Sequence, residues 1–185
     1  MPVTYVNRQE TTYYLHTGKT RKGNARYWFA KSAEGDLAEA IPEGYEVYEN
    51  PDAQVFLRKI VPQKVTPSEL AVVTKGLEQY AAGERCLVDV QGEHIVVYHA
   101  EKTEFDLRHS PFAFREPVYF GRYIKVLQFI LDDEVKRIFR VQRWCFRGSI
   151  DDWLDLSSRR CEGKLPDLVK TYGPHIGKES FFELM

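Results

Sequence analysis

Four times along the chain, two runs rich in aromatic or β-branched residues flank a short polar segment, and this pattern restricts the fold more than any other feature. Flat and β-branched side chains suit a pleated surface, and a polar turn between two such runs indicates an antiparallel hairpin. The predicted hairpins cover residues 12–31, 41–60, 86–100 and 118–146. With 11 Tyr and 11 Phe among 185 residues, the composition also favours sheet over helix.

The clearest helix signal follows the second hairpin. Thr66, Pro67 and Glu69 match a capped helix start, in which Thr is the cap, Pro takes the first helical position and Glu returns a hydrogen bond to the cap. An apolar stripe at helical spacing follows, and Gly83 ends it. The pattern predicts a helix over about 67–82.

Two segments near the C-terminus carry weaker helix signals. Ser149 with Asp152 three residues later predicts a helix over 150–156, and KLPDLVKTYG predicts another that ends at Gly173. Together the elements predict an α+β fold of antiparallel hairpins with a few covering helices. We expect two subdomains: a small antiparallel β subdomain at 1–62, whose four strands form one sheet, and an α+β subdomain at 63–185.

The charges balance overall but not locally. The chain has 26 Lys plus Arg and 27 Asp plus Glu, so no net field draws it to nucleic acid. Residues 1–31 nevertheless hold six cations and one carboxylate, whereas residues 34–52 hold seven carboxylates and no cation. The loop between the aromatic runs of the first hairpin carries Lys19, Arg21, Lys22 and Arg26.

This basic loop has two interpretations. Its cations are able to neutralise phosphates while neighbouring Tyr and Trp side chains stack on bases, as in single-strand binders. Alternatively, the acidic segment that follows cancels the basic loop across one sheet, each cation facing a carboxylate. From the sequence we favour cancellation, which leaves little attraction for polyanions.

A second basic region lies in the hairpin at 118–146. Arg140 and Arg143 stand among aromatic residues, so we expect them to be partly buried and paired with carboxylates or aromatic rings. His109 lies in an irregular segment at 101–116, and loops carry function more often than strands do. These three residues form the candidate pocket.

Catalytic and metal-binding patterns are weak. Cys145 is the candidate nucleophile, but His175, the histidine nearest to it in sequence, is 30 residues away, so we interpret the thiol as a small core side chain. The aspartates at 151, 152 and 155 fit a helix start, where negative charge is stabilised, better than a metal site. The sequence has no histidine pair at metal spacing and no phosphate loop, and we predict neither metal nor cofactor.

The compartment follows from what the sequence lacks. The start has no signal-peptide pattern, and no window approaches the 18 or more apolar residues of a membrane span. The three cysteines are odd in number and far apart, which predicts reduced thiols. We expect a cytoplasmic protein that does not enter membranes.

Several segments resemble a recurrent pattern in a family of uncharacterised bacterial proteins: GKTRKGNARYWFAK, AIPEGYEVYENPDAQVFLRK, RWCFRGSIDDWLDL and HIGKESFFEL. The resemblance covers most of the chain. It implies a bacterial, cytoplasmic protein whose two halves belong together, and it carries over no activity, ligand or site residue.

Three functions remain open. The favoured one is a non-enzymatic binding or adaptor protein that recognises a protein or peptide through an aromatic sheet face or strand edge. The first alternative is a nucleic-acid-binding protein that uses the loop at 19–26, with Arg122 and Lys125 from the later hairpin. The second alternative is a small hydrolase or transferase built around His109, Cys145 or a cluster of Glu and Asp.

Overall fold

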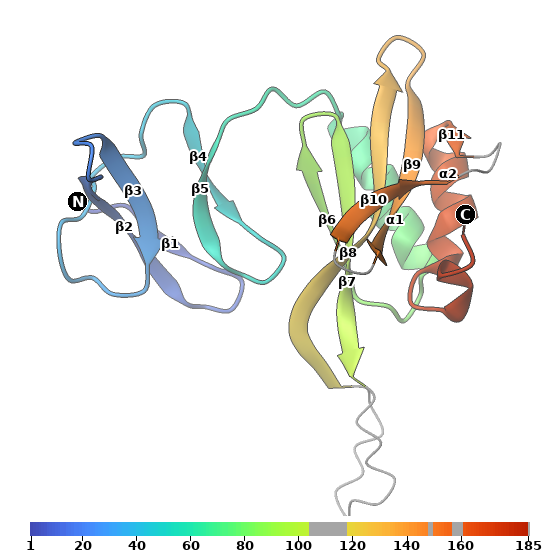
Figure 1. Cartoon of the computed structure of the whole chain (residues 1–185), viewed down its shortest axis with the longest axis horizontal. Coiled ribbons are helices and arrows are strands. Elements are labelled where there is room, and N and C mark those ends of the chain that lie inside the picture. The colour runs from blue at the N-terminus through green and yellow to red at the C-terminus, as the bar shows by residue number, and fades with distance from the viewer. Residues whose placement is uncertain (104–117, 148–149, 157–160, 185) are drawn as a thin grey trace, which may run out of the picture. The chain divides into compact units, whose positions relative to one another are not determined.

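The computed structural model describes residues 1–103, 118–147, 150–156 and 161–184 (Figure 1). The chain divides into two compact units, an N-terminal unit, Met1–Val61, and a C-terminal unit, Pro62–Met185. Within the described residues, the strands form three antiparallel sheets and are accompanied by two α-helices. The predicted α+β class is confirmed.

The N-terminal unit holds two separate sheets. Strands β1 (Thr4–Val6), β2 (Thr12–Lys19) and β3 (Ala25–Ala30) form the first, in the order β1-β2-β3. Strands β4 (Tyr45–Glu49) and β5 (Val55–Lys59) form the second. The hairpins predicted at 12–31 and 41–60 are confirmed, but their expected union in one four-stranded sheet is wrong.

The occupied edge of β2 explains why the sheets stay apart. β1 pairs with the first half of β2, so that Val6 stands opposite Thr12. The acidic segment takes the second half, because the Thr17 amide donates to the Asp36 carbonyl at 3.0 Å and the Ala38 amide donates to the Leu15 carbonyl at 2.8 Å. With β3 on the other side, β2 has no edge left for β4.

A buried amide joins the two sheets of the N-terminal unit. Asn7 Nδ2 donates to the carbonyl of Ala53, in the β4–β5 turn, at 2.6 Å. Its Oδ1 accepts hydrogen bonds from the amides of Gln9 at 3.1 Å and Thr11 at 2.8 Å. The Asn7 side chain thus shapes the β1–β2 turn and holds it against the β4–β5 turn. These buried hydrogen bonds add stability to a unit whose core is small.

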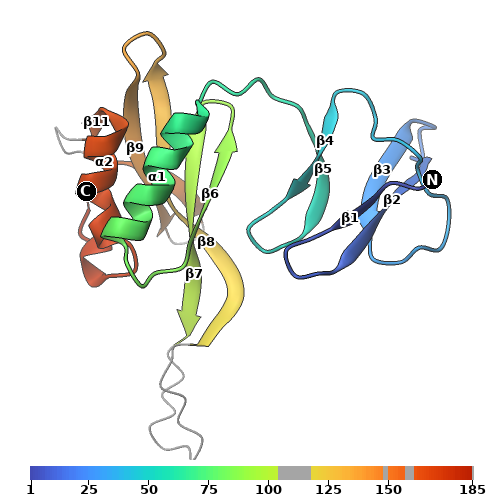
Figure 2. The ribbon, with the colours of Figure 1, turned by 180° about the vertical axis from the view of Figure 1, so that it is seen from behind.

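The C-terminal unit is built on a larger antiparallel sheet in the order β10-β9-β8-β7-β6, with β11 pairing beside β10 on β9. The hairpins predicted at 86–100 and 118–146 are confirmed. Figure 2 shows both helices in front of this sheet, on one face. The strands are β6 (Cys86–Gln91), β7 (His94–Thr103), β8 (Val118–Asp133), β9 (Ile138–Arg147), β10 (Ile150–Asp155) and β11 (Glu162–Gly163).

The helix predicted over 150–156 is wrong. These residues form β10, which pairs antiparallel with β9 so that Asp155 stands opposite Gln142 and Trp153 opposite Trp144. The two indoles meet edge to face, with centroids 5.0 Å apart. Cross-strand aromatic contact and ladder hydrogen bonds outweigh a local cap signal, because capping contributes only about 1 kcal/mol.

The other two predicted helices are confirmed as α1 (Pro67–Tyr80) and α2 (Leu165–Tyr172). At the start of α1, Thr66 Oγ1 accepts from the Glu69 amide at 3.3 Å, and the Thr66 amide donates to Glu69 Oε2 at 2.9 Å. Short 3₁₀ turns follow α2 at Gly173–His175 and Glu179–Phe181. No helix in the described ranges has the length and apolar character of a bilayer span.

The core of the C-terminal unit lies between the sheet and the two helices. Val73 and Leu77 of α1 and Val169 of α2 are buried there against sheet residues such as Phe129. The helices approach closely at Gly76, where an added Cβ would lie 2.4 Å from Val169 Cγ1. The sheet therefore has one face dedicated to packing the helices.

Candidate functional site

The turn between β2 and β3 is a hydrogen-bonded, exposed projection. The Thr20 amide donates to the Asn24 carbonyl at 2.8 Å, and the Asn24 amide donates to Thr20 Oγ1 at 3.1 Å. Gly23 takes a positive φ of 83°, which glycine adopts without a side-chain clash. Four exposed cations surround this turn and are called the basic tip: Lys19, Arg21, Lys22 and Arg26.

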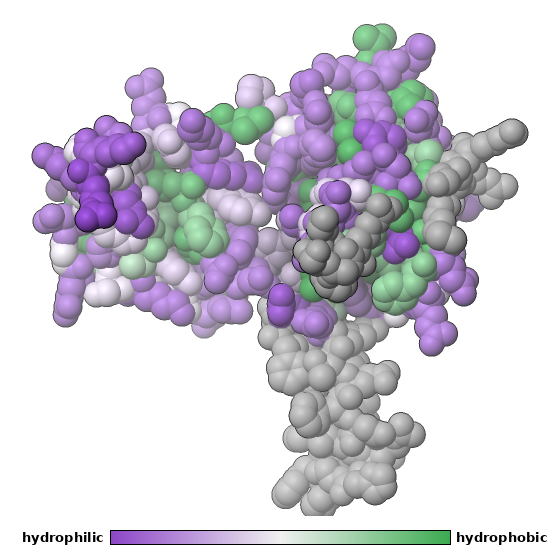
Figure 3. Space-filling model, viewed as in Figure 1, coloured by the Kyte–Doolittle hydropathy of each residue, from purple (hydrophilic) through white to green (hydrophobic). Residues whose placement is uncertain are grey.

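The basic tip is not neutralised by the acidic segment. Among the described residues, none of its four cations takes part in an ion pair. Two carboxylates of the acidic segment bind other arginines: Glu49 lies 3.5 Å from Arg8, and Glu46 lies 2.7 Å from Arg58. Within the described chain, Arg8 pairs with the acidic segment as expected, but the four cations of the basic tip do not. In Figure 3, strongly hydrophilic residues, in deep purple, gather at the end of the N-terminal unit where β2 and β3 lie.

An aromatic stack lies beside the basic tip. Trp28 stands directly opposite His16, and the two rings are nearly parallel, with centroids 5.4 Å apart and planes inclined by 16°. His16 is buried, and its Nε2 is 2.9 Å from the Ser32 carbonyl, so this nitrogen donates. The guanidinium of Arg26 lies 5.3 Å from the centroid of the Trp28 ring, a cation–π contact.

The local sequence accounts for this arrangement. Arg26 and Trp28 are two residues apart on β3 and share a face, with Gly18 opposite Arg26 on β2. An added Cβ on Gly18 would lie 3.2 Å from the six-membered ring of Trp28, so the indole leans into the space that glycine leaves. Leu15 on β2 is fully buried, whereas residues 25–28 on β3 are exposed. The base of the hairpin is packed and its end is presented to solvent.

The second basic region has partners within the C-terminal unit. Arg140 Nε donates to Asp132 at 3.0 Å, and its Nη1 donates to Asp155 at 2.5 Å. Hydrogen bonds to Asp132 and then Asp155 raise the pKa of Arg140. Asp155 also accepts from Gln142 Nε2 at 2.7 Å, and the bonds from Gln142 and Arg140 lower its pKa. Arg140 is therefore held in a cross-strand polar network.

Arg143 does not join Arg140 in a pocket. Arg143 is three residues further along β9, so it projects from the opposite face of the sheet, and its Nε is buried with no hydrogen-bond partner in the described chain. His109 lies outside the described residues. Lys125 Nζ lies 4.9 Å from the centroid of the Trp144 ring, and the exposed Arg122 is 4.0 Å from Glu101.

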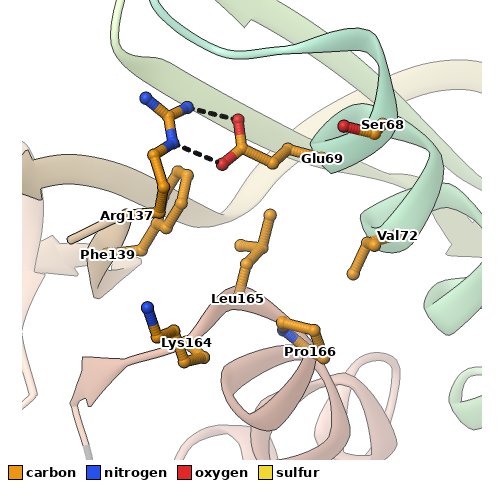
Figure 4. A pocket seen from close by; sticks show the side chains of 8 residues that line it. All are labelled: Ser68, Glu69, Val72, Arg137, Phe139, Lys164, Leu165 and Pro166. Atoms are coloured by element: carbon orange, nitrogen blue, oxygen red, sulfur yellow. Dashed lines mark hydrogen bonds and ion pairs between the residues drawn. The ribbon is translucent and has the colours of Figure 1, made fainter. Parts of the chain in front are cut away.

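A pocket that sequence reasoning missed lies where the starts of α1, α2 and β9 meet (Figure 4). Its volume is about 170 Å³. At its rim, Arg137 Nε donates to Glu69 Oε1 at 2.8 Å, and a second bond joins Arg137 to Glu69 Oε2. The lining residues are Ser68, Glu69, Val72, Arg137, Phe139, Lys164, Leu165 and Pro166.

The carboxylate of Glu69 stays charged at this rim. Burial alone would raise its pKa, but hydrogen bonds from Arg137 and Thr66 outweigh burial and hold the pKa below its usual value. The hydrogen bonds between Arg137 and Glu69 also raise the pKa of Arg137. The sequence indicated Glu69 as the residue that completes the capping box with Thr66. Its pairing with Arg137, 68 positions away, leaves no local signal.

Catalytic and metal-binding arrangements find little support in the described part of the chain. Cys145 is partly buried in β9, and no hydrogen bond joins it to a described histidine. His175 Nδ1 lies 2.9 Å from Ser180 Oγ, and His99 Nε2 lies 2.6 Å from Glu84 Oε2. Within the described ranges, no three His, Cys, Asp or Glu side chains cluster in a metal-binding group.

Comparison with known proteins gives no match to a family model, a curated protein or a solved structure. The resemblance to a family of uncharacterised bacterial proteins therefore stays a prediction.

Proposed function

We propose that the protein binds nucleic acid through the basic tip of the N-terminal unit. The observation that carries this proposal is the lack of ion pairs at Lys19, Arg21, Lys22 and Arg26 among the described residues. The preference for a protein or peptide partner depended on cancellation of these charges by the acidic segment. Because Glu49 and Glu46 bind Arg8 and Arg58, and no carboxylate pairs with the basic tip among the described residues, that reason no longer holds.

The energetics favour a moderate, salt-sensitive interaction. An exposed cation without a carboxylate partner gives up no ion pair when it meets a phosphate, and each contact releases a condensed counterion. Four contacts correspond to a slope of about −3 in a plot of log affinity against log salt. A polyanion contact of this kind gives dissociation constants of about 10⁻⁴–10⁻⁶ M at physiological salt. The near-neutral chain adds no long-range attraction.

Binding of labelled oligonucleotides, followed by fluorescence anisotropy from 20 to about 200 mM salt, tests the proposal. The variant Lys19→Ala/Arg21→Ala/Lys22→Ala is expected to lose at least tenfold in affinity and to reduce the salt slope by about three quarters, because it removes three of the four contacts. All three side chains are exposed, so circular dichroism and thermal stability should remain unchanged.

A matched control removes the same charge elsewhere. Lys75, Lys170 and Lys178 are exposed in the C-terminal unit, and their replacement by Ala should leave affinity within about twofold of the wild type. Equal losses in the two triple variants would mean that net charge, not the basic tip, governs binding. No binding by the wild type at the lowest salt would remove the proposal.

We propose peptide recognition at the pocket beside Glu69 as a second candidate function. The favouring observation is the apolar lining, which includes Val72, Phe139 and Leu165. Its volume of about 170 Å³ is close to the ~150 Å³ of a cavity that accepts benzene, so it suits one apolar side chain. Arrays of peptides with a single Leu or Phe should bind the wild type and not a Val72→Trp variant; indifference to this substitution would count against the pocket.

A further inference from the structure

The side chain of Trp28 contacts two neighbouring side chains and yet remains open to solvent. It is 38% exposed, although it stacks on His16 and contacts Arg26. A large aromatic side chain that is already fixed loses little conformational entropy when a ligand binds it. The absence of a side chain at Gly18 sets the tilt of the ring. These features describe an exposed indole that is held by His16 and has a guanidinium over its ring.

Only some nucleic acids are able to use such a surface. In a duplex the base faces are stacked on one another, so a protein meets phosphates and groove edges. In a single strand the bases turn outward and stack on aromatic side chains, while cations follow the backbone. Arg26 and Trp28 share one face of β3, which places a phosphate-binding group beside a base-stacking group.

We infer that the hairpin selects single-stranded nucleic acid, with an unpaired base stacked on Trp28 and the adjoining phosphate bound by Arg26. This inference rests on the proposed function and names its ligand class. The cations supply affinity for any strand, and the indole supplies the preference for unpaired bases. His16 acts as a positioning residue because its buried ring stacks on the indole from the opposite strand.

The chain offers a matched pair of aromatic residues for the test. Tyr27 is also 38% exposed but projects from the other face of β3, away from Arg26. The variants Trp28→Leu, Trp28→Phe and Tyr27→Leu are compared with wild type. Each is titrated with an oligo-dT single strand, a duplex of equal length and heparin, which is a polyanion without bases.

The wild type is expected to bind the single strand more tightly than the duplex or heparin. Trp28→Leu should weaken single-strand binding by about tenfold, as for one lost stacking contact, and leave duplex binding and the salt slope unchanged. Trp28→Phe should retain most of the affinity, and Tyr27→Leu should match the wild type. Because stacked bases quench indole emission, oligo-dT should quench the wild type more than the Phe variant.

The outcomes separate this inference from the proposed function. Equal affinity for single strand, duplex and heparin overturns the inference, while loss of binding in the triple variant at the basic tip still supports the proposed function. Equal losses in Trp28→Leu and Tyr27→Leu also overturn it. If Trp28→Leu does not fold, absence of a quenching difference between wild type and Trp28→Phe overturns it. No binding to any of the three ligands overturns both.

Discussion

At the scale of single residues, Glu69 joins the start of α1 to the β8–β9 turn. Its carboxylate accepts a hydrogen bond from the amide of the cap residue Thr66 and two from Arg137. Because its pKa in the folded protein is lowered from the usual 4.5, the charged form stabilises the fold fully above that pH, and the stabilisation disappears as pH falls through the folded pKa.

Glu69→Gln should therefore lower the free energy of unfolding by about 1 kcal/mol at pH 7 and by much less at pH 3. Urea denaturation at both pH values measures the difference. Glu78→Gln, which alters an exposed carboxylate on the same helix, should change stability little at either pH. A deficit in Glu69→Gln that stays constant down to pH 3 would contradict the assigned role of the charge.

The sequence indicated residue roles only where a partner is close along the chain. Thr66 and Glu69 are three positions apart, so their mutual capping was predictable. The partner of Arg137 is 68 positions away, and the stacking of His16 on Trp28 depends on hairpin register. Residue order also failed to show that Glu46 and Glu49 bind Arg58 and Arg8 rather than the basic tip.

At the scale of elements, the packing of α1 on α2 depends on Gly76. Alanine at this position improves helix propensity by about 1 kcal/mol, but its methyl group would lie 2.4 Å from Val169 Cγ1. Val169 is buried and has little room to move. Gly76→Ala should therefore lower stability by about 1–3 kcal/mol, as overpacking does.

A double-mutant cycle checks the cause of this loss. Combined with Val169→Ala, which removes the clashing methyl groups, Gly76→Ala should cost much less than it does alone. Thermal or urea denaturation of the four proteins gives the coupling energy. Additive effects of the two substitutions would show that the close approach of the helices is not responsible.

Elements with a complete local signal were predictable, and elements defined by a distant partner were not. The hairpins and α1 each contain their own turn or cap residues. β1 has only three residues and gains its conformation from pairing with β2. In β10 the cap pattern of Ser149 and Asp152 predicted a helix, but the segment forms a strand because it pairs with β9, where Trp153 contacts Trp144.

At the scale of the whole molecule, the division into two units predicts that each unit unfolds independently of the other. Leu15 is fully buried in the N-terminal unit, and Val73 is fully buried in the other. Leu15→Ala should cost about 2–5 kcal/mol and should reduce amide-exchange protection mainly within residues 1–61. Val73→Ala should reduce protection mainly within 62–185. Loss of protection throughout the chain in either variant would show that the units unfold together.

Equal numbers of opposite charges in the N-terminal unit have a consequence for its approach to a charged surface. Residues 1–61 hold eight Lys or Arg and eight Asp or Glu, and four exposed cations gather at the basic tip. A neutral body with separated charges is rotated by a distant field and is drawn only weakly. Attraction grows once the tip comes within the screening distance of ~8 Å at physiological salt. A negatively charged surface thus first turns the basic tip of the unit toward itself, and the tip binds only at short range.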